Sequence, residues 1–363
     1  MRIEIEKRAA TKLAGDINSM LSGYGASMKF MEVCGTHTMA IHSSGIKSLF
    51  TSKLVLVSGP GCPVCVTEKL FIDQAIFLGK KFGACLVTFG DLIRVPGTEG
   101  SLADLRSQGG SVKVVYSPMD VIGIAAQVAP QPVVFLGVGF ETTIPTVAVT
   151  LKTALSQNVG NLFVLPAFKT IHRPLKILAS QKDLSGFLLP GHVSAIIGAD
   201  SYDYLPRDHQ KPGVIAGFDG LDILLAIRSL VKMTVKNEAR IENEYRTVVK
   251  PEGNVVARAL IDEVFEPADA SWRGLGVIPG SGLALRTPYD AFDALKRFPM
   301  EVPAAPDDPR CKCARILTGE LTPNQCGLFG GECVPEAPVG PCMVSSEGTC
   351  AAYYKYGGGS VDA

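Results

Sequence analysis

The chain has 363 residues, of which 47% are hydrophobic and 19% are charged, and its formal net charge is zero. This composition allows a sizeable core, and it lacks the basic surface on which nucleic-acid binding depends. A charged N-terminus and short apolar runs indicate neither a signal peptide nor a membrane span, so we expect a cytoplasmic protein without membrane or nucleic-acid partners.

The chain contains ten cysteines in two separate groups. Cys34, Cys62, Cys65 and Cys85 lie in the first quarter, and the other six lie within residues 311–350. In a reducing cytoplasm such cysteines are more often metal ligands or catalytic thiols than structural disulfides. The gap between the groups predicts two separate sulfur chemistries.

After an N-terminal helical segment, predicted over residues 1–27, the chain repeats a short apolar run, a polar Gly/Pro-rich loop and a helical pattern. Apolar runs without alternation are typical of parallel strands with helices on both faces. We therefore predict an α/β fold with two small, doubly wound-like parallel-sheet domains, at 28–120 and 121–235; one larger sheet is the alternative. The predicted strands are, in chain order, "KFMEV", "KLVLV", "ACLVTF", "VKVVY", "PVVFLGV", "NLFVLP", "GFLLP" and "GVIAGF".

One helix is predicted over 67–83, with Thr67 as its N-cap and Gly83 at its end. Residues 236–363 form the predicted C-terminal domain, which begins with a polar helical stretch without strands. From residue 264 onward, Pro, Gly and Cys replace the long apolar runs. We expect a helical and irregular iron–sulfur domain there, because a metal cluster can order a segment that buries little apolar surface.

The loop "EVCGTHTMAIH" follows the first predicted strand and places Cys34, Thr36 and His37 in one turn. At the carboxyl ends of parallel strands, helix N-termini direct their N–H groups toward ligands and stabilise thiolates. We predict that Cys34 is a nucleophile or a metal ligand. The alternative is a buried cysteine beside an N-capping threonine.

The loop "GPGCPVC" follows the second predicted strand. The spacing of Cys62 and Cys65 before a helix is typical of a thioredoxin-like redox dithiol. A zinc site would require a second C-x-x-C or a nearby Cys/His pair, and the chain has no other C-x-x-C. A redox pair is therefore favoured over half of a zinc site or a tight structural turn.

Three further loops carry polar candidates. Asp91 in "TFGDLIRVPG" and Glu141 with Thr142 and Thr143 in "GFETT" are predicted to line the same crevice. The alternatives are an exposed ion pair for the first loop and a helix-capping glutamate for the second. His192 in "PGHVSAIIG" is a candidate because four of the five histidines lie in such loops, although one histidine could equally be structural.

The C-terminal cysteines follow the pattern C-x-C-x12-C-x6-C-x8-C-x7-C, from Cys311 to Cys350. Zinc ribbons prefer paired C-x2-C knuckles, which are missing from this run. Unpaired cysteines in Gly/Pro loops better suit a [4Fe–4S] cluster, which four thiolates hold. We predict a cluster, with zinc as the alternative; six candidates for four places leave two thiols spare.

Five motifs in this order resemble the HypD family of hydrogenase maturation factors: "CGTHT" (34–38), "GPGCPVC" (59–65), "GFETT" (139–143), "PGHVSAIIG" (190–198) and "CMVSSEGTCAAYY" (342–354). The resemblance extends along essentially the whole chain. One position departs from the pattern, since Ala314 follows Cys313 where we expect Gly.

The resemblance implies assembly of the iron centre of [NiFe] hydrogenases. The protein would carry Fe(II) with CN and CO ligands together with a small HypC-type chaperone, and a HypE-type partner would deliver the cyanide. Cys34 would be the iron ligand, and a [4Fe–4S] cluster would pass electrons to Cys62 and Cys65. The cluster ligands would be four of Cys313, Cys326, Cys333, Cys342 and Cys350.

The residues expected to take part in the chemistry are Cys34, Cys62, Cys65, Glu141 and His192. Those expected to line the binding site of the iron complex are Thr36, His37, Asp91, Thr142 and Thr143. Two other functions stay open at this point. One is a stand-alone iron–sulfur-dependent thiol/disulfide oxidoreductase, and the other is a zinc-stabilised binding protein without redox chemistry.

Overall fold

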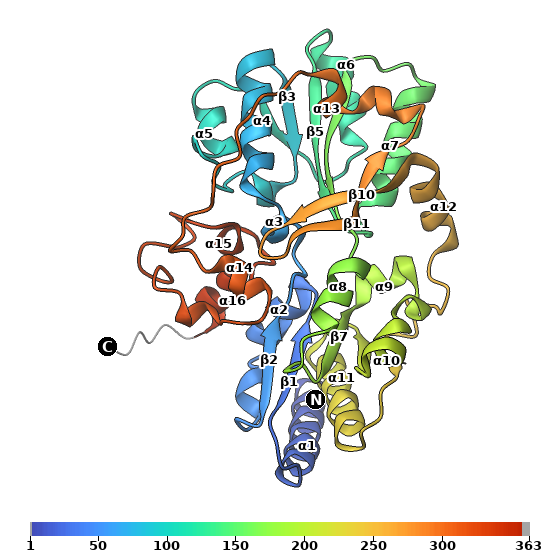
Figure 1. Ribbon diagram of the computed structural model, residues 1–363, viewed down its shortest axis with the longest axis vertical. Coiled ribbons are helices and arrows are strands. Elements are labelled where there is room, and N and C mark those ends of the chain that lie inside the picture. The colour runs from blue at the N-terminus through green and yellow to red at the C-terminus, as the bar shows by residue number, and fades with distance from the viewer. Residues whose placement is uncertain (1, 358–363) are drawn as a thin grey trace.

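Two parallel β-sheets frame the molecule in the computed structural model, which describes residues 2–357 (Figure 1). In this part of the chain, sheet A has the spatial strand order β2 (Leu54–Ser58), β1 (Met28–Glu32), β7 (Gly186–Pro190), β8 (Gly213–Ala216) and β9 (Ile241–Asn243). Sheet B has the order β4 (Val112–Val114), β3 (Cys85–Thr88), β5 (Val133–Gly139) and β6 (Leu162–Phe168). Neighbouring strands are parallel throughout both sheets, which confirms the predicted α/β class and all eight predicted strands.

Helices cover both faces of each sheet, because the strands are apolar on both sides. On sheet A, one face packs against α1 (Arg2–Ser22) and α11 (Gly220–Val235), and the other against α8 (His172–Ala179) and α10 (Tyr204–His209). On sheet B, one face packs against α4 (Lys69–Phe82) and α5 (Leu102–Ser107), and the other against α6 (Asp120–Val128) and α7 (Ile144–Ser156). Short elements at the strand ends are α2 (Gly35–Ser43), η1 (Ile46–Leu49), α3 (Pro63–Val66), η2 (Gly90–Leu92), α9 (Gly191–Ile197) and η3 (Ala199–Tyr202).

The two sheets are not built from consecutive halves of the chain. β1 and β2 begin sheet A, β3 to β6 then form all of sheet B, and the chain returns to sheet A for β7 to β9. The predicted ranges 28–120 and 121–235 therefore group the strands wrongly. Every strand–loop–helix unit has the same local pattern, and sheet membership depends on contacts between segments that are distant in sequence.

The predicted helix over 67–83 corresponds to α4 and ends at Gly83, whose φ of +62° suits glycine. Its start differs from the prediction, since Glu68 is the N-cap. Thr67 instead ends α3, and its hydroxyl donates to the carbonyl oxygen of Pro63 (2.8 Å). No helix within residues 2–357 is long and apolar enough to cross a membrane.

The last third of the described chain lies along both domains. We call these the sheet A domain and the sheet B domain, each consisting of one sheet and the helices that cover it. β9 is a half-buried, polar edge strand in a stretch where only helix was predicted. The antiparallel hairpin of β10 (Phe265–Trp272) and β11 (Gly276–Leu285) was also missed, because its Pro and Gly residues hide the strand pattern. The other elements are α12 (Val255–Val264), η4 (Tyr289–Phe292), α13 (Ala294–Arg297), α14 (Cys313–Leu317), η5 (Pro323–Gln325), α15 (Pro341–Val344) and α16 (Thr349–Tyr356).

The cysteine-rich end of the chain bridges the two domains at one side of the molecule (Figure 1). α15 packs against α3, which leads into the sheet B domain, and α16 packs against α2 of the sheet A domain. The loops that follow β1 and β2 therefore both meet the C-terminal segment.

Candidate functional site

Cys34 lies just beyond the carboxyl end of β1, where the chain enters α2. Its extended backbone makes it the N-cap of α2, and its buried thiol makes no capping hydrogen bond. The buried Glu32 carboxylate fixes this turn by accepting the hydroxyl of Thr38 (2.6 Å) and the N–H of Cys34 (3.4 Å). Burial raises the pKa of Cys34 to about 12, although backbone N–H groups of α2 act in the opposite direction. The N–H groups at the start of α2 thus stabilise the Cys34 thiolate as expected, but burial outweighs their effect on the pKa.

Thr36, His37 and His192 fix the elements around Cys34. The hydroxyl of Thr36 donates to Glu347 (2.6 Å). Nε2 of His37 lies 2.9 Å from a carbonyl oxygen just after β8, and burial lowers the pKa of His37 to about 4. The rings of His37 and His192 both contact Phe218, with centroid distances of 5.0 and 4.0 Å. Both histidines therefore belong to a packed aromatic cluster.

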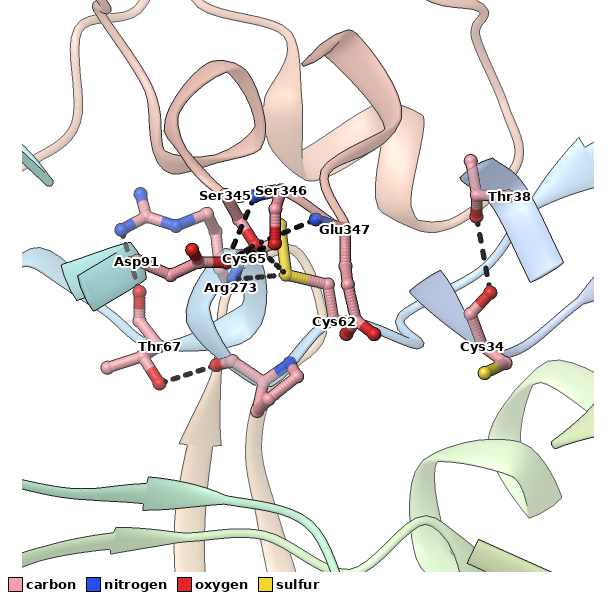
Figure 2. Close-up of a disulfide and its surroundings, with 11 residues drawn as sticks. Cys34, Thr38, Cys62, Cys65, Thr67, Asp91, Arg273, Ser345, Ser346 and Glu347 are labelled. Carbon is pink, nitrogen blue, oxygen red and sulfur yellow. Dashed lines mark hydrogen bonds between the residues drawn. A yellow bond between two sulfur atoms is a disulfide. The ribbon is translucent and has the colours of Figure 1, made fainter. Parts of the chain in front are cut away.

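Cys62 and Cys65 are joined by a disulfide at the start of α3 (Figure 2). Cys62 is the N-cap of this helix, and its sulfur accepts the N–H of Cys65 (3.1 Å). Pro63 fixes the backbone at the first helical position. Both sulfurs are buried, and Oγ of Ser345 lies 3.3 Å from Sγ of Cys62. The two thiols thus have the proximity that a redox dithiol requires.

Asp91 ties the turn after α15 to the dithiol. Its Oδ2 accepts hydrogen bonds from the hydroxyl of Ser345 (2.9 Å) and from the N–H (2.9 Å) and hydroxyl (2.8 Å) of Ser346. Figure 2 shows these residues gathered beside the disulfide. Because one carboxylate oxygen satisfies three donors, Asp91 holds the C-terminal turn against the sheet B domain.

A cavity of about 370 Å³ lies beside this turn, at the carboxyl ends of β3, β4 and β5. We call it the dithiol cavity; its walls include Pro63, Asp91, Tyr116, Thr143, Ser345 and Glu347. Thr143 is half-buried at the N-cap of α7, whereas Thr142 is exposed. The carboxyl edge of an open parallel sheet is the usual position for a ligand site.

Glu141 is buried where the two domains meet. Its Oε1 accepts the N–H of Ile171 (2.9 Å), and its Oε2 has no partner among the described residues. Burial raises the pKa of Glu141 to about 7. Burial also raises the pKa of Tyr202 from the sheet A domain, and the charges of Glu141 and Cys34 add to this rise. Both groups are thus within electrostatic reach of the same tyrosine.

The six C-terminal cysteines line one small cavity, whose other walls are mainly apolar. None of the six is bonded to another cysteine. Within residues 2–357, no group of three or more His, Cys, Asp or Glu converges to hold a single metal ion. A [4Fe–4S] cluster requires four thiolates around it, and a mainly apolar cavity lined by six cysteines fits that group. The cysteines that line the cavity are Cys311, which was not among the five predicted ligands, and Cys313, Cys326, Cys333, Cys342 and Cys350.

Two glycines bring the Cys34 loop, the dithiol loop and the C-terminal turn into contact. The N–H of Gly35 donates to the carbonyl oxygen of Gly61 (3.1 Å). A Cβ on Gly61 would lie 2.3 Å from the nitrogen of Cys34, and a Cβ on Gly35 would lie 2.5 Å from Cβ of Glu347. The backbones approach this closely only because both positions lack side chains. Three segments distant in sequence therefore form one sulfur-rich region.

The model of the HypD family, described as "Hydrogenase formation hypA family", matches residues 8–357. The chain belongs to the HypD family. The hydrogenase maturation factor HypD of Escherichia coli (strain K12) is 42% identical over 332 residues, covering 91% of this chain and 89% of the relative. A putative hydrogenase expression/formation protein of Methanocaldococcus jannaschii is 40% identical over 355 residues, covering 98% and 99%. The hydrogenase maturation factor HypD of Rhizobium leguminosarum bv. viciae is 41% identical over 341 residues, covering 91% and 89%.

The five motifs that resemble the HypD family meet around the boundary between the domains. The Cys34 loop, the dithiol loop and the C-terminal motif are in direct contact, and the GFETT motif adds Thr143 to the dithiol cavity. In the PGHVS motif, Ser194 shares a hydrogen bond with Tyr202 (3.0 Å). Neither His37 nor His192 is among the residues that line the dithiol cavity.

Sequence reasoning missed four residues of this HypD site. Ser345 and Glu347 lie in "SSEG", which was noted only as part of a motif. Glu32 is hidden in an apolar strand, where a single carboxylate gives no pattern. Arg273 lies in the β10–β11 turn, and its Nη2 donates to the carbonyl oxygen of Thr67 at the end of α3 (2.9 Å). It gave no signal in the sequence, because its hairpin was not recognised.

Replacing Gly61 with alanine should destabilise this member of the HypD family. The new Cβ would lie 2.3 Å from the nitrogen of Cys34, so one of the two loops would have to move. Overpacking of this kind costs about 1–3 kcal/mol. We expect a lower thermal unfolding midpoint, measured by circular dichroism.

The matched control is Gly160→Ala, because a Cβ at Gly160 would have no atom within 4 Å. Its unfolding midpoint should stay close to that of the unmodified protein. Equal midpoints for the two variants would show that Gly61 is not needed for the close approach of the loops.

Proposed function

We propose that this member of the HypD family is an assembly scaffold and redox factor for the iron centre of [NiFe] hydrogenases. Family membership supports a role in hydrogenase maturation, which is the role that the names of its relatives state. The finer proposal rests on one observation, the contact between the Cys34 loop, the disulfide of Cys62 and Cys65, and the cysteine-rich C-terminal segment.

In this proposal, Cys34 holds the iron cargo. Fe(II) with CN and CO ligands favours soft thiolate donors, and Cys34 is a thiol without a disulfide partner at the domain boundary. Glu32 and Thr38 fix the turn on which it lies, and Thr36 ties that turn to Glu347. A HypC-type chaperone would share the iron.

Cys62 and Cys65 supply electrons in this proposal. A HypE-type partner would offer cyanide as a thiocyanate, and releasing cyanide from sulfur takes two electrons and leaves a thiolate. Oxidation of the two thiols to a disulfide provides two electrons and releases two protons. A [4Fe–4S] cluster held by four of the six C-terminal cysteines would supply one-electron redox chemistry beside this pair.

The test is complementation of a strain that lacks its own HypD-family protein. The unmodified chain should restore [NiFe] hydrogenase activity, and Cys62→Ala or Cys65→Ala should leave activity at background. Cys85→Ala is the matched control, because Cys85 is a buried free thiol in β3. It packs in the core on one face of sheet B, whereas Cys62 and Cys65 pack in the core on the other face. Full activity with Cys62→Ala would contradict the proposed redox role.

The stand-alone thiol/disulfide oxidoreductase is tested with the isolated protein. Steady turnover of a thiol substrate without partner proteins, unchanged by Cys34→Ala, would support that function in place of the scaffold. The scaffold predicts no such turnover, because its electrons are used within a complex.

A further inference from the structure

The turn of the β10–β11 hairpin places a buried cation beside the dithiol helix. Arg273 is only 5% exposed. Its backbone N–H donates to the carbonyl oxygen of Val66 (3.0 Å), and its Nη2 donates to that of Thr67 (2.9 Å). These carbonyls follow Cys65 directly, at the end of α3, where a helix leaves carbonyl groups without partners. Arg273 thus holds the end of the helix that carries the disulfide (Figure 2).

The same turn packs against the cysteine-lined cavity. Gly274 has a φ of +86°, and a Cβ there would lie 2.6 Å from the carbonyl oxygen of Ala314. Ala314 is the residue after Cys313 in α14, so the hairpin turn lies between the dithiol helix and the first cysteines of the C-terminal run. Gly274 therefore permits the close approach of the hairpin turn to the backbone of α14.

The charge of Arg273 is only partly compensated. Its ion-pair partner is Asp307, whose side chain is 47% exposed. Nε of Arg273 is buried and has no partner among the described residues. A guanidinium with one partly solvated partner creates a positive potential in its low-dielectric surroundings.

We propose that Arg273 is a positioning residue for the Cys62–Cys65 pair, fixing α3 against α14 and favouring the reduced pair through its charge. Reduction takes two electrons, breaks the S–S bond and leaves two thiolates, which then take up protons from water as their pKa values require. A nearby cation stabilises thiolates more than it stabilises a neutral disulfide. The role of this effect in the cell rests on the proposed redox function. The equilibrium between the disulfide and the two thiols can be measured independently of that function.

The test compares the disulfide equilibrium of the full chain and of Arg273→Gln. Each protein is equilibrated without oxygen in mixtures of reduced and oxidised dithiothreitol, and free thiols are trapped by alkylation. Dithiothreitol supplies the electron pair and becomes its cyclic disulfide. Mass spectrometry of the peptide that contains both cysteines then gives the reduced fraction. We expect the equilibrium constant for reduction to fall about tenfold, as the loss of a charge interaction of about 1.4 kcal/mol requires.

Three further variants separate charge from structure. Arg273→Lys keeps the positive charge but lacks the planar guanidinium group. Its equilibrium constant for reduction should therefore lie between those of the unmodified chain and Arg273→Gln. Asp307→Asn removes the compensating anion from an exposed position, so it should shift the equilibrium in the opposite direction. Arg286→Gln is the control on the same hairpin, because Arg286 binds the carbonyl oxygen of Phe265 and pairs with Glu266. It should leave the equilibrium unchanged.

Shifts of Arg273→Gln and Asp307→Asn in the same direction would overturn the proposal, because they would show that the charge of Arg273 does not favour the reduced pair. An unchanged equilibrium in both variants would also overturn it. The proposed function can fail independently of this proposal. It fails if the chain does not restore hydrogenase activity, even where Arg273→Gln shifts the disulfide equilibrium as expected.

Discussion

Replacing Cys34 with alanine should abolish retention of the iron cargo and reduce hydrogenase activation to background. The thiol is the proposed iron ligand, and alanine offers no donor atom at that position. The fold should be preserved, because the substitution removes one sulfur atom, whereas the turn is held by Glu32 and Thr38. The measurements are iron per chain after anaerobic purification from cells that express the partner proteins, and infrared bands of iron-bound CN and CO.

Cys85→Ala is the control for Cys34→Ala. Both residues are buried and unbonded, but Cys85 packs in the core on the α6 and α7 side of sheet B. The control should retain the infrared bands and the cargo iron. Cargo iron and infrared bands that persist at full intensity in Cys34→Ala would eliminate Cys34 as the ligand.

Single Cys→Ser substitutions in the C-terminal run should divide the six cysteines into four ligands and two spare thiols. All six line the same cavity, so the structure gives them similar access to a bound cluster. A [4Fe–4S] cluster takes four thiolates, so four variants should lose acid-labile sulfide and broad visible absorption. The other two should keep both properties.

The measurement is iron, zinc and acid-labile sulfide per chain, in proteins purified without oxygen. Cys34→Ala serves as the internal control, because it should lose cargo iron and keep sulfide. Stoichiometric zinc without sulfide in the unmodified protein would contradict the cluster and support a zinc-stabilised binding protein.

The local structure could be predicted well because it depends on neighbouring residues. The apolar runs of sheets A and B have no alternation, and every predicted strand forms. Gly83 ends α4 as expected, since the left-handed backbone conformation at this position favours glycine. Sheet membership could not be predicted, because β1 and β7 are neighbours only through contacts that join Phe30 with Gly186.

The cysteines of the site could be predicted, because the chemistry of a thiol depends on the residue type itself. Cys62 and Cys65 are bonded to each other, and the six C-terminal cysteines line one cavity. Residues whose importance comes from their surroundings were harder to assign. His192 stacks on Phe218 and does not line the dithiol cavity. Arg273 was not singled out, because only the fold brings it to the carbonyl groups that it binds.

The insertion of sheet B between β2 and β7 has a consequence for biosynthesis. As the chain leaves the ribosome, all four strands of sheet B emerge before the first of the three strands that complete sheet A. The strands of sheet B can therefore pair with one another while β1 still presents an unpaired edge and α1 awaits α11. The core of sheet B is completed later, by Phe265, Phe292 and Phe298. During that interval the unpaired edge of β1 is open to pairing with another chain.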